Sequence, residues 1–209
     1  MLVDLSHTIS EGMPAYPGDA PTEVRRVELD RPWHVLRLAL GTHSGTHIDA
    51  ACHYVPGGRT IDEYPLERFV PDAWVVHLDS VAGEVISWAA LDSRLPQSGR
   101  AGAAVLLHTG WDRYWGRPDA EHHPYLSVDA AQRLADAGVG LVGTDAFSLD
   151  ATAGGTEHAH AALLGADVLI VENLTHLERL EGAGPYRCAF VPLRIEGGDG
   201  SPIRAYAYV

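Results

Sequence analysis

Lysine is absent from the 209-residue sequence, so arginine supplies all 15 basic side chains. This absence excludes catalysis through a lysine Schiff base. The 28 Asp and Glu residues give a formal net charge of -13 at pH 7, the opposite of a basic surface that binds phosphate backbones. We therefore expect no nucleic-acid partner, and acid/base, metal, hydroxyl or thiol chemistry remains.

Cysteine and long apolar runs are also scarce. The two cysteines, Cys52 and Cys188, lie far apart, and no secretion signal is visible, so we expect free thiols rather than a disulfide framework. No segment approaches the roughly 18 consecutive apolar residues of a membrane span. These features predict a cytoplasmic protein that has no membrane partner.

What is present is an ordinary globular composition, with 46% hydrophobic and 21% charged residues. The length predicts a single domain, residues 1–209. Short apolar or alternating segments bounded by Gly, Pro or Asp predict strands. These segments are residues 24–29, 33–40, 73–78, 104–108, 140–143, 168–171, 188–195 and 203–209.

Helical periodicity appears in fewer places. It predicts helices over residues 85–95, over 128–137 behind the N-cap Ser127, and more weakly over 157–164. Gly138 is placed to end the second helix. Residues 196–202, E-G-G-D-G-S-P, predict a hairpin loop between the last two strands. The mixture indicates an α/β fold.

The densest group of polar residues is G-T-H-S-G-T-H-I-D-A-A-C-H, which places His43, His47, Asp49 and His53 within eleven residues. Histidine nitrogen and aspartate oxygen bind zinc and similar ions, and the first three could converge where the backbone turns. We expect a glycine-rich loop and then a helix from near Thr46, with Asp49 in its first turn. His53 would stand over the site as a general acid/base. An ordinary surface loop rich in histidine remains the alternative.

A second source of ligands lies in residues 156–174. Glu172 ends the apolar run D-V-L-I-V, where a carboxylate is costly to bury unless it is paired or bound to a cation. It could equally reach solvent as the strand stops. His158 and His160 precede it, and their spacing lets only one of them point inward without indicating which.

These residues make the chain resemble the metal-dependent cyclase-family hydrolases, which include bacterial kynurenine formamidases and isatin hydrolases. The family motif H-x-G-T-H-x-D-x-x-x-H is unbroken here. The resemblance extends over nearly the whole chain, through D-L-S-H-T-I, M-P-A-Y-P-G-D, L-L-H-T-G-W-D-R-Y-W, V-G-T-D-A-F-S-L-D and the run from H-A-A-L-L to E-N-L. It implies a swivelling β/β/α fold with a mixed sheet and flanking helices, and a homodimer.

The resemblance also implies a site. His43, His47 and Asp49 would bind metal and His53 would act as the acid/base residue, while His160 and Glu172 would complete a second metal position. Zinc, as two ions, is the expected cofactor, with manganese possible. Tyr16 in A-Y-P-G-D would help line the substrate pocket. The Y-P-G-D form is closer to the formamidase branch.

The implied activity is hydrolysis of an N-formyl arylamine such as N-formylkynurenine, with metal-activated water and His53 as general acid/base. Two alternatives remain. One is opening or closing of a cyclic amide, imide or lactone such as isatin, and the other is a non-catalytic protein that keeps a structural metal. Aromatic residues at 111, 114, 115 and 147 could line a pocket or belong to the core. Cys52, beside His53, is the weaker candidate for a nucleophile.

Overall fold

The computed structural model describes residues 1–96 and 98–209, and within them a nine-stranded mixed sheet forms the centre of the molecule. The strand order is β1-β13-β11-β5-β7-β9-β10-β4-β12. The bounds are β1 Leu2–Asp4, β13 Tyr206–Tyr208, β11 Tyr186–Ala189, β5 Asp72–His77, β7 Ala104–His108, β9 Leu141–Thr144, β10 Leu169–Glu172, β4 His47–Asp49 and β12 Gly200–Pro202. The mixed α/β architecture predicted from the sequence is confirmed.

The centre of the sheet is parallel, because β5, β7, β9 and β10 pair in parallel, while the strands outside them pair antiparallel. Such central strands are covered on both faces, so most of their residues are apolar, and polar residues stand at the strand ends. Successive residues of β7 therefore point to opposite faces of the sheet: Leu106 packs in one hydrophobic cluster and Leu107 in the other.

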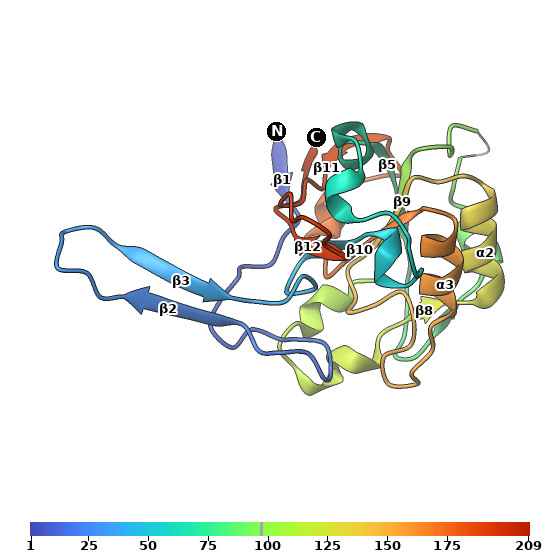
Figure 1. Ribbon diagram of the computed structural model, residues 1–209. Helices are drawn as coiled ribbons and strands as arrows, with labels where there is room; N and C mark the ends of the chain where they lie inside the picture. Colours follow the sequence, from blue (N-terminus) through green and yellow to red (C-terminus); the bar gives the residue numbers. More distant parts are fainter. Residues whose placement is uncertain (97) are drawn as a thin grey trace.

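Helices cover one face of this sheet. They are α1 (Trp88–Asp92), α2 (Val128–Asp136) and α3 (His158–Gly165), of which α2 and α3 stand side by side in Figure 1. Their buried side chains, among them Leu91, Leu134 and Leu163, join one hydrophobic cluster. Short 3-10 turns lie elsewhere: η1 Ala51–His53, η2 Ile61–Glu63, η3 Leu66–Phe69, η4 Trp111–Tyr114, η5 Pro118–His122 and η6 Leu177–Arg179.

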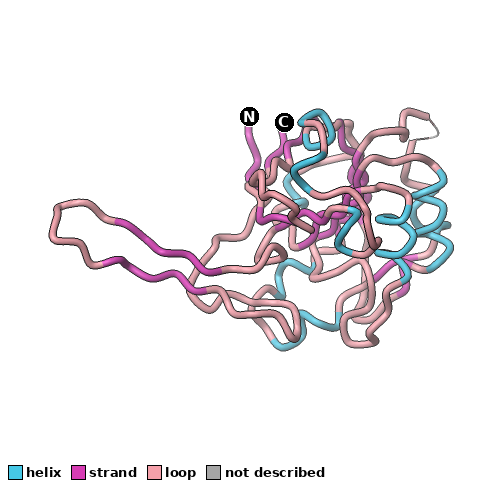
Figure 2. Tube along the Cα trace, in the orientation of Figure 1, coloured by secondary structure: helices cyan, strands magenta, loops and turns pink. Residues whose placement is uncertain are grey.

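A long β-hairpin projects from the body, as Figures 1 and 2 show. It consists of β2 (Glu23–Val27) and β3 (Val35–Ala39), paired antiparallel, and we call residues 23–39 the hairpin arm. Every residue of β3 is exposed. A further small parallel pair joins β6 (Val85–Ile86) to β8 (Tyr125–Leu126).

Several predicted elements appear as expected. The strand over 104–108 is β7, and α2 follows its predicted cap, since Ser127 Oγ accepts a hydrogen bond of 3.1 Å from Ala130 N. Gly138 lies beyond the helix at φ 69°. Cys52 and Cys188 are free, as predicted. Among the described residues, none of the helices has both the length and the apolar character that crossing a membrane requires.

Three predicted elements outside the candidate site differ in part from the structure. The strand predicted over 188–195 ends at Ala189 in β11. The helix predicted over 85–95 is shorter in the structure. Val85 and Ile86 form β6 and pair with β8, and the helix α1 covers only Trp88–Asp92, after the N-cap Ser87. Residues 196–202 are not simply a loop, because Gly200–Pro202 form β12, which pairs with β4. The adjacent strands β11 and β13 do pair with each other, but β12 lies within their connection.

Candidate metal centre

The strand β4 places the first group of candidate ligands, and this corrects the helix predicted from Thr46. His47, Ile48 and Asp49 are extended, so His47 and Asp49 point to the same face of the sheet. The reason is pairing on both edges: β10 lies on one side of β4 and β12 on the other. Gly45, at φ 66°, makes the turn that precedes the strand.

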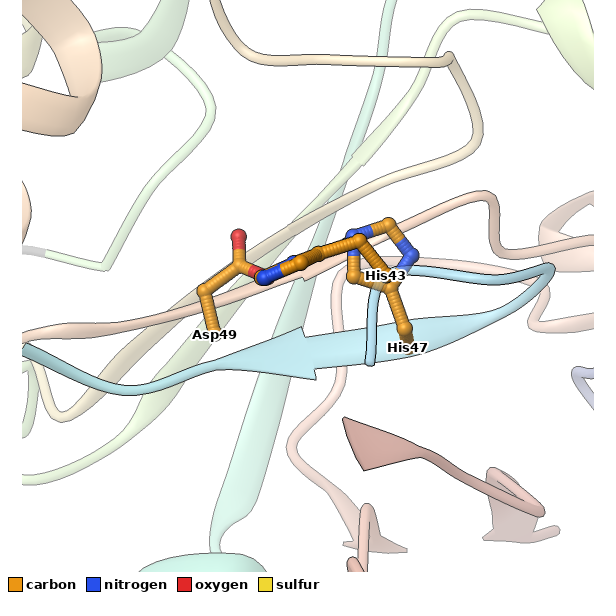
Figure 3. A group of neighbouring side chains, drawn as sticks. All are labelled: His43, His47 and Asp49. Carbon is orange, nitrogen blue, oxygen red and sulfur yellow. The ribbon is translucent and has the colours of Figure 1, made fainter. Parts of the chain in front are cut away.

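Figure 3 shows His43, His47 and Asp49 converging above β4. Asp49 Oδ1 is 2.7 Å from His43 Nδ1 and 3.3 Å from His47 Nε2. His47 and Asp49 are buried, with Asp49 only 1% exposed. One nitrogen or oxygen from each residue lies close enough to the others to hold a single ion.

A second group shares Asp49. His160 Nε2, from α3, is 3.8 Å from Asp49 Oδ2 and 3.5 Å from Glu172 Oε1, at the end of β10. Register places Glu172 opposite His47, and their side chains are 3.6 Å apart. Asp49, His160 and Glu172 could therefore hold an ion of their own. Asp49 would stand between the two positions, with one oxygen toward each.

The donor chemistry fits cations. Asp49 Oδ2 is buried and finds no hydrogen-bond partner among the residues that the structure describes. An unpaired buried carboxylate oxygen is costly, and a bound cation removes that cost. Burial raises the pKa of the Glu172 carboxyl, since removal from water disfavours its charge. Histidine nitrogen and carboxylate oxygen are the ligand types that zinc and manganese accept.

Hydrogen bonds made by their Nδ1 atoms fix the orientations of the His47 and His160 rings. His47 Nδ1 donates a hydrogen bond of 2.8 Å to Gly45 O, which leaves Nε2 toward the group. His160 Nδ1 donates one of 2.8 Å to Asp150 Oδ2, which again leaves Nε2 toward the group. His158 differs, because its Nε2 contacts Leu126 O at 2.7 Å. The structure thus places His160 in the group and turns His158 Nε2 elsewhere.

Charge around the rings alters their protonation in the metal-free protein. Burial works to lower the pKa of His43, but the hydrogen bond and charge of Asp49 prevail and raise it to about 9. Burial is likewise outweighed at His160, where Asp150 and then Glu172 raise the pKa to about 9. Protons therefore compete with a metal ion for these nitrogens.

His53 lies outside the two groups that share Asp49, although it forms a third cluster of ligand-type side chains with His43 and Asp199. Its ring centroid is 4.0 Å from that of His43 and 6.0 Å from that of His160, and 34% of its side chain is exposed. Burial lowers the pKa of His53. A lowered pKa favours the neutral ring, which can accept a proton and pass it on, as general acid/base catalysis requires.

A cavity of about 550 Å³ opens over these residues. Its walls include the two candidate ligand groups and His53, together with the aromatic residues Tyr16, Tyr54 and Phe147. Tyr16, which the family resemblance implied as a pocket residue, is one of the residues that line this cavity. Of the other aromatic candidates, Trp115 stacks on His7 at 4.2 Å and Trp111 is buried.

Two residues near the site were not predicted from the sequence. Asp150 was given no role, yet it holds His160, and Asp199 lies 3.2 Å from His43 Nε2. No local pattern marks either residue, although Asp199 stands next to a glycine within a turn-rich segment. Cys52 is a poor nucleophile here, because burial raises the pKa of its thiol.

Comparison with known proteins agrees with this geometry. The model of the Cyclase family, described as "Putative cyclase", matches residues 3–151. A kynurenine formamidase from Maricaulis maris (strain MCS10) is 36% identical over 218 residues, covering 97% of this chain and 95% of that protein. Isatin hydrolase A from Ralstonia solanacearum has a similar structure, with a TM-score of 0.85, 27% identity and coverage of 99% and 91% of the two chains.

A third protein, described as a potential metal-dependent hydrolase with cyclase activity, has a TM-score of 0.81 at 27% identity, covering 99% of this chain and 96% of that one. The matches span nearly the full length, and the family motif lies in the candidate site. The chain belongs to the cyclase family.

Proposed function

We propose that this protein is a metal-dependent hydrolase that cleaves the C–N bond of an N-formyl arylamine such as N-formylkynurenine, releasing formate and the free amine. The observation that carries the proposal is Asp49 Oδ2, which is buried, has no hydrogen-bond partner in the part of the chain that the structure describes, and lies between two sets of ligand-type side chains in the wall of a cavity. The near full-length similarity to a kynurenine formamidase supports the choice of substrate.

The positions of these groups suggest separate roles for the metal, the aromatic side chains and His53. Bound metal would lower the pKa of a water molecule toward neutrality and polarise the formyl carbonyl. Tyr16 and Phe147 offer apolar ring faces to the arylamine, and the cavity volume is within the range of small-molecule sites. His53 delivers a proton to the departing nitrogen, since it lies beside the ligand groups and is partly exposed to the cavity.

The cofactor we propose is zinc, as two ions, with manganese as the alternative. His43, His47 and Asp49 would hold one ion, and Asp49, His160 and Glu172 the other. Support comes from the two oxygens of Asp49, of which Oδ1 faces His43 and His47 and Oδ2 faces His160. Nitrogen and carboxylate donors suit either metal.

We also propose a cytoplasmic homodimer that acts in tryptophan catabolism. Free cysteines are common in reducing compartments. The hairpin arm exposes Trp33, Leu36 and Leu38 by 61%, 60% and 51%. An isolated two-stranded hairpin is only marginally stable, and a second copy of the chain would cover these side chains.

A second candidate activity is hydrolysis of a cyclic amide, imide or lactone, as the similarity to an isatin hydrolase suggests. The same groups could open a ring, because attack on the carbonyl and proton delivery to the leaving atom are common to both reactions. A purely structural metal is disfavoured by the open cavity, since structural sites are closed by protein ligands.

The test is turnover of N-formylkynurenine by the purified protein after exhaustive chelation, and again after zinc or manganese is returned. We expect activity to disappear and then to recover with one of the two ions. Metal-loaded protein that turns over isatin or a lactone, but not the formamide, would assign the second activity. Loaded protein that turns over none of these substrates would contradict the hydrolase proposal.

A further inference from the structure

Each histidine of the two ligand groups has one nitrogen facing the group and one facing an oxygen outside it. For His47 that oxygen is the Gly45 carbonyl, and for His160 it is the Asp150 carboxylate. His43 follows the same rule. Its Nδ1 faces Asp49 Oδ1 at 2.7 Å, and its Nε2 faces Asp199 Oδ2 at 3.2 Å.

The same oxygen of Asp199 also reaches the catalytic candidate. Asp199 Oδ2 is 3.5 Å from His53 Nδ1, and the rings of His43 and His53 lie 4.0 Å apart. One carboxylate therefore stands between a candidate ligand and the candidate acid/base. Asp199 does not line the cavity, and 44% of its side chain is exposed to solvent.

The fold holds Asp199 in this place. Its carbonyl accepts a hydrogen bond of 2.9 Å from Ala50 N, and Gly200, the next residue, pairs with Asp49 across β12 and β4. Burial works to raise the pKa of the Asp199 carboxyl, but interactions with the Thr42 side chain and with His43 prevail and lower it. Gly200 lets the strand approach closely, because an added Cβ would lie 2.8 Å from His43 Cε1.

We propose that Asp199 is a positioning residue that holds the ring of His43 for metal binding and the ring of His53 for proton transfer. This inference rests on the proposed function and extends it to a residue from the opposite end of the chain. When His43 Nδ1 gives its lone pair to an ion, Nε2 keeps its proton and needs an acceptor, which Asp199 supplies. The carboxylate also orients His53 Nδ1, leaving its other nitrogen for the substrate.

The first test is Asp199→Asn, which keeps the shape and removes the charge. Glu196→Gln is the matched control, because Glu196 is exposed in the same segment and loses the same charge. Zinc affinity is measured by competition with a chromophoric chelator. We expect Asp199→Asn to bind zinc roughly 10- to 100-fold more weakly and Glu196→Gln to match the wild type. This measurement does not depend on which substrate is turned over.

The second readout is kinetic, at saturating metal, with whichever substrate the wild type hydrolyses. We expect Asp199→Asn to lower kcat by about 10-fold or more while KM stays within about twofold. In a His53→Ala background the same substitution should change kcat by less than about twofold, because the ring it orients is gone.

Unchanged zinc affinity and unchanged kcat in Asp199→Asn would overturn the proposal. So would an equal fall of kcat with and without His53. If Asp199→Asn does not fold, as circular dichroism would show, Thr42→Val replaces it, since the Thr42 side chain interacts with the same carboxylate. Thr42→Val should weaken zinc binding in the same direction, and an unchanged affinity would count against the role of Asp199. Absence of formamidase activity in the wild type affects only the proposed function.

Discussion

Asp49 and His53 lie in the same cavity wall but in different environments, so their substitutions should separate metal binding from catalysis. Asp49 is buried between both ligand groups, and we expect Asp49→Ala to abolish metal binding. His53 belongs to neither of the two ligand groups that contain Asp49. His53→Ala should therefore keep nearly full metal content while kcat falls by roughly 100-fold or more. Metal analysis and steady-state kinetics on both variants test this. Full metal in Asp49→Ala, or metal loss in His53→Ala, would contradict the assignment.

His7 should make stability depend on pH. Burial lowers its pKa to about 4, its ring stacks on Trp115, and its buried Nε2 has no hydrogen-bond partner among the described residues. The unfolded chain binds a proton near pH 6.5, above the folded pKa, so this stability is complete above about 6.5 and is lost as pH falls toward 4.

We therefore expect His7→Phe, which keeps the ring stacking, to lose less stability than the wild type between pH 7 and 4.5, by on the order of 2 kcal/mol. Urea denaturation of the metal-free proteins at both pH values measures the difference. His122→Phe, at an exposed position, is the control and should follow the wild type. If the wild type and His7→Phe lose the same free energy of unfolding between pH 7 and 4.5, His7 does not take up a proton on unfolding.

The sequence indicated the candidate ligands because His43, His47 and Asp49 lie in one short motif and Glu172 ends an apolar strand. It left His158 and His160 equivalent, and the difference arises only from what surrounds the rings: Leu126 O for one and Asp150 for the other. Asp199 was missed because it lies 156 residues from His43 in the chain. Strand pairing brings the two together, and no local pattern encodes that pairing.

At the level of elements, prediction succeeded where local chemistry is decisive. The helix α2 has its own cap and a glycine after its end, and β7 has four successive apolar residues, Ala104–Leu107, before His108. It failed at β4, where we expected a helix from near Thr46. Pairing with β10 and β12 decides the conformation there, and a three-residue strand has too few residues to show an alternating pattern.

The strand β12 packs so closely against β4 and His43 that a side chain at Gly200 should not be tolerated. A Cβ at Gly200 would lie 2.7 Å from Ile48 O and 2.8 Å from His43 Cε1. We expect Gly200→Ala to destabilise the fold by about 1–3 kcal/mol and to weaken zinc binding by displacing His43. Gly165→Ala is the control, since nothing lies within 4 Å of its added Cβ. Chemical denaturation and chelator competition measure both effects, and wild-type values for Gly200→Ala would refute the fit.

The whole molecule combines a closely packed body with a hairpin arm that packs little against it. Both sheet faces of the body are buried, whereas the arm carries exposed apolar side chains on β3 and in its loop. Such side chains in water favour association, and a symmetric dimer is the commonest way to bury them. The net charge of -13 opposes indiscriminate aggregation, so a defined interface is the expected outcome.

We therefore expect the wild type to have twice the 22.5 kDa chain mass in light scattering, and Trp33→Ser with Leu36→Ser to shift it toward the monomer. Leu66→Ser is the matched control, because Leu66 is 68% exposed but lies on η3, outside the arm. Metal content should survive in the double variant, since both ligand groups come from a single chain. A dimer that persists in the double variant would place the interface elsewhere, and a monomeric wild type would leave the arm without the partner proposed for it.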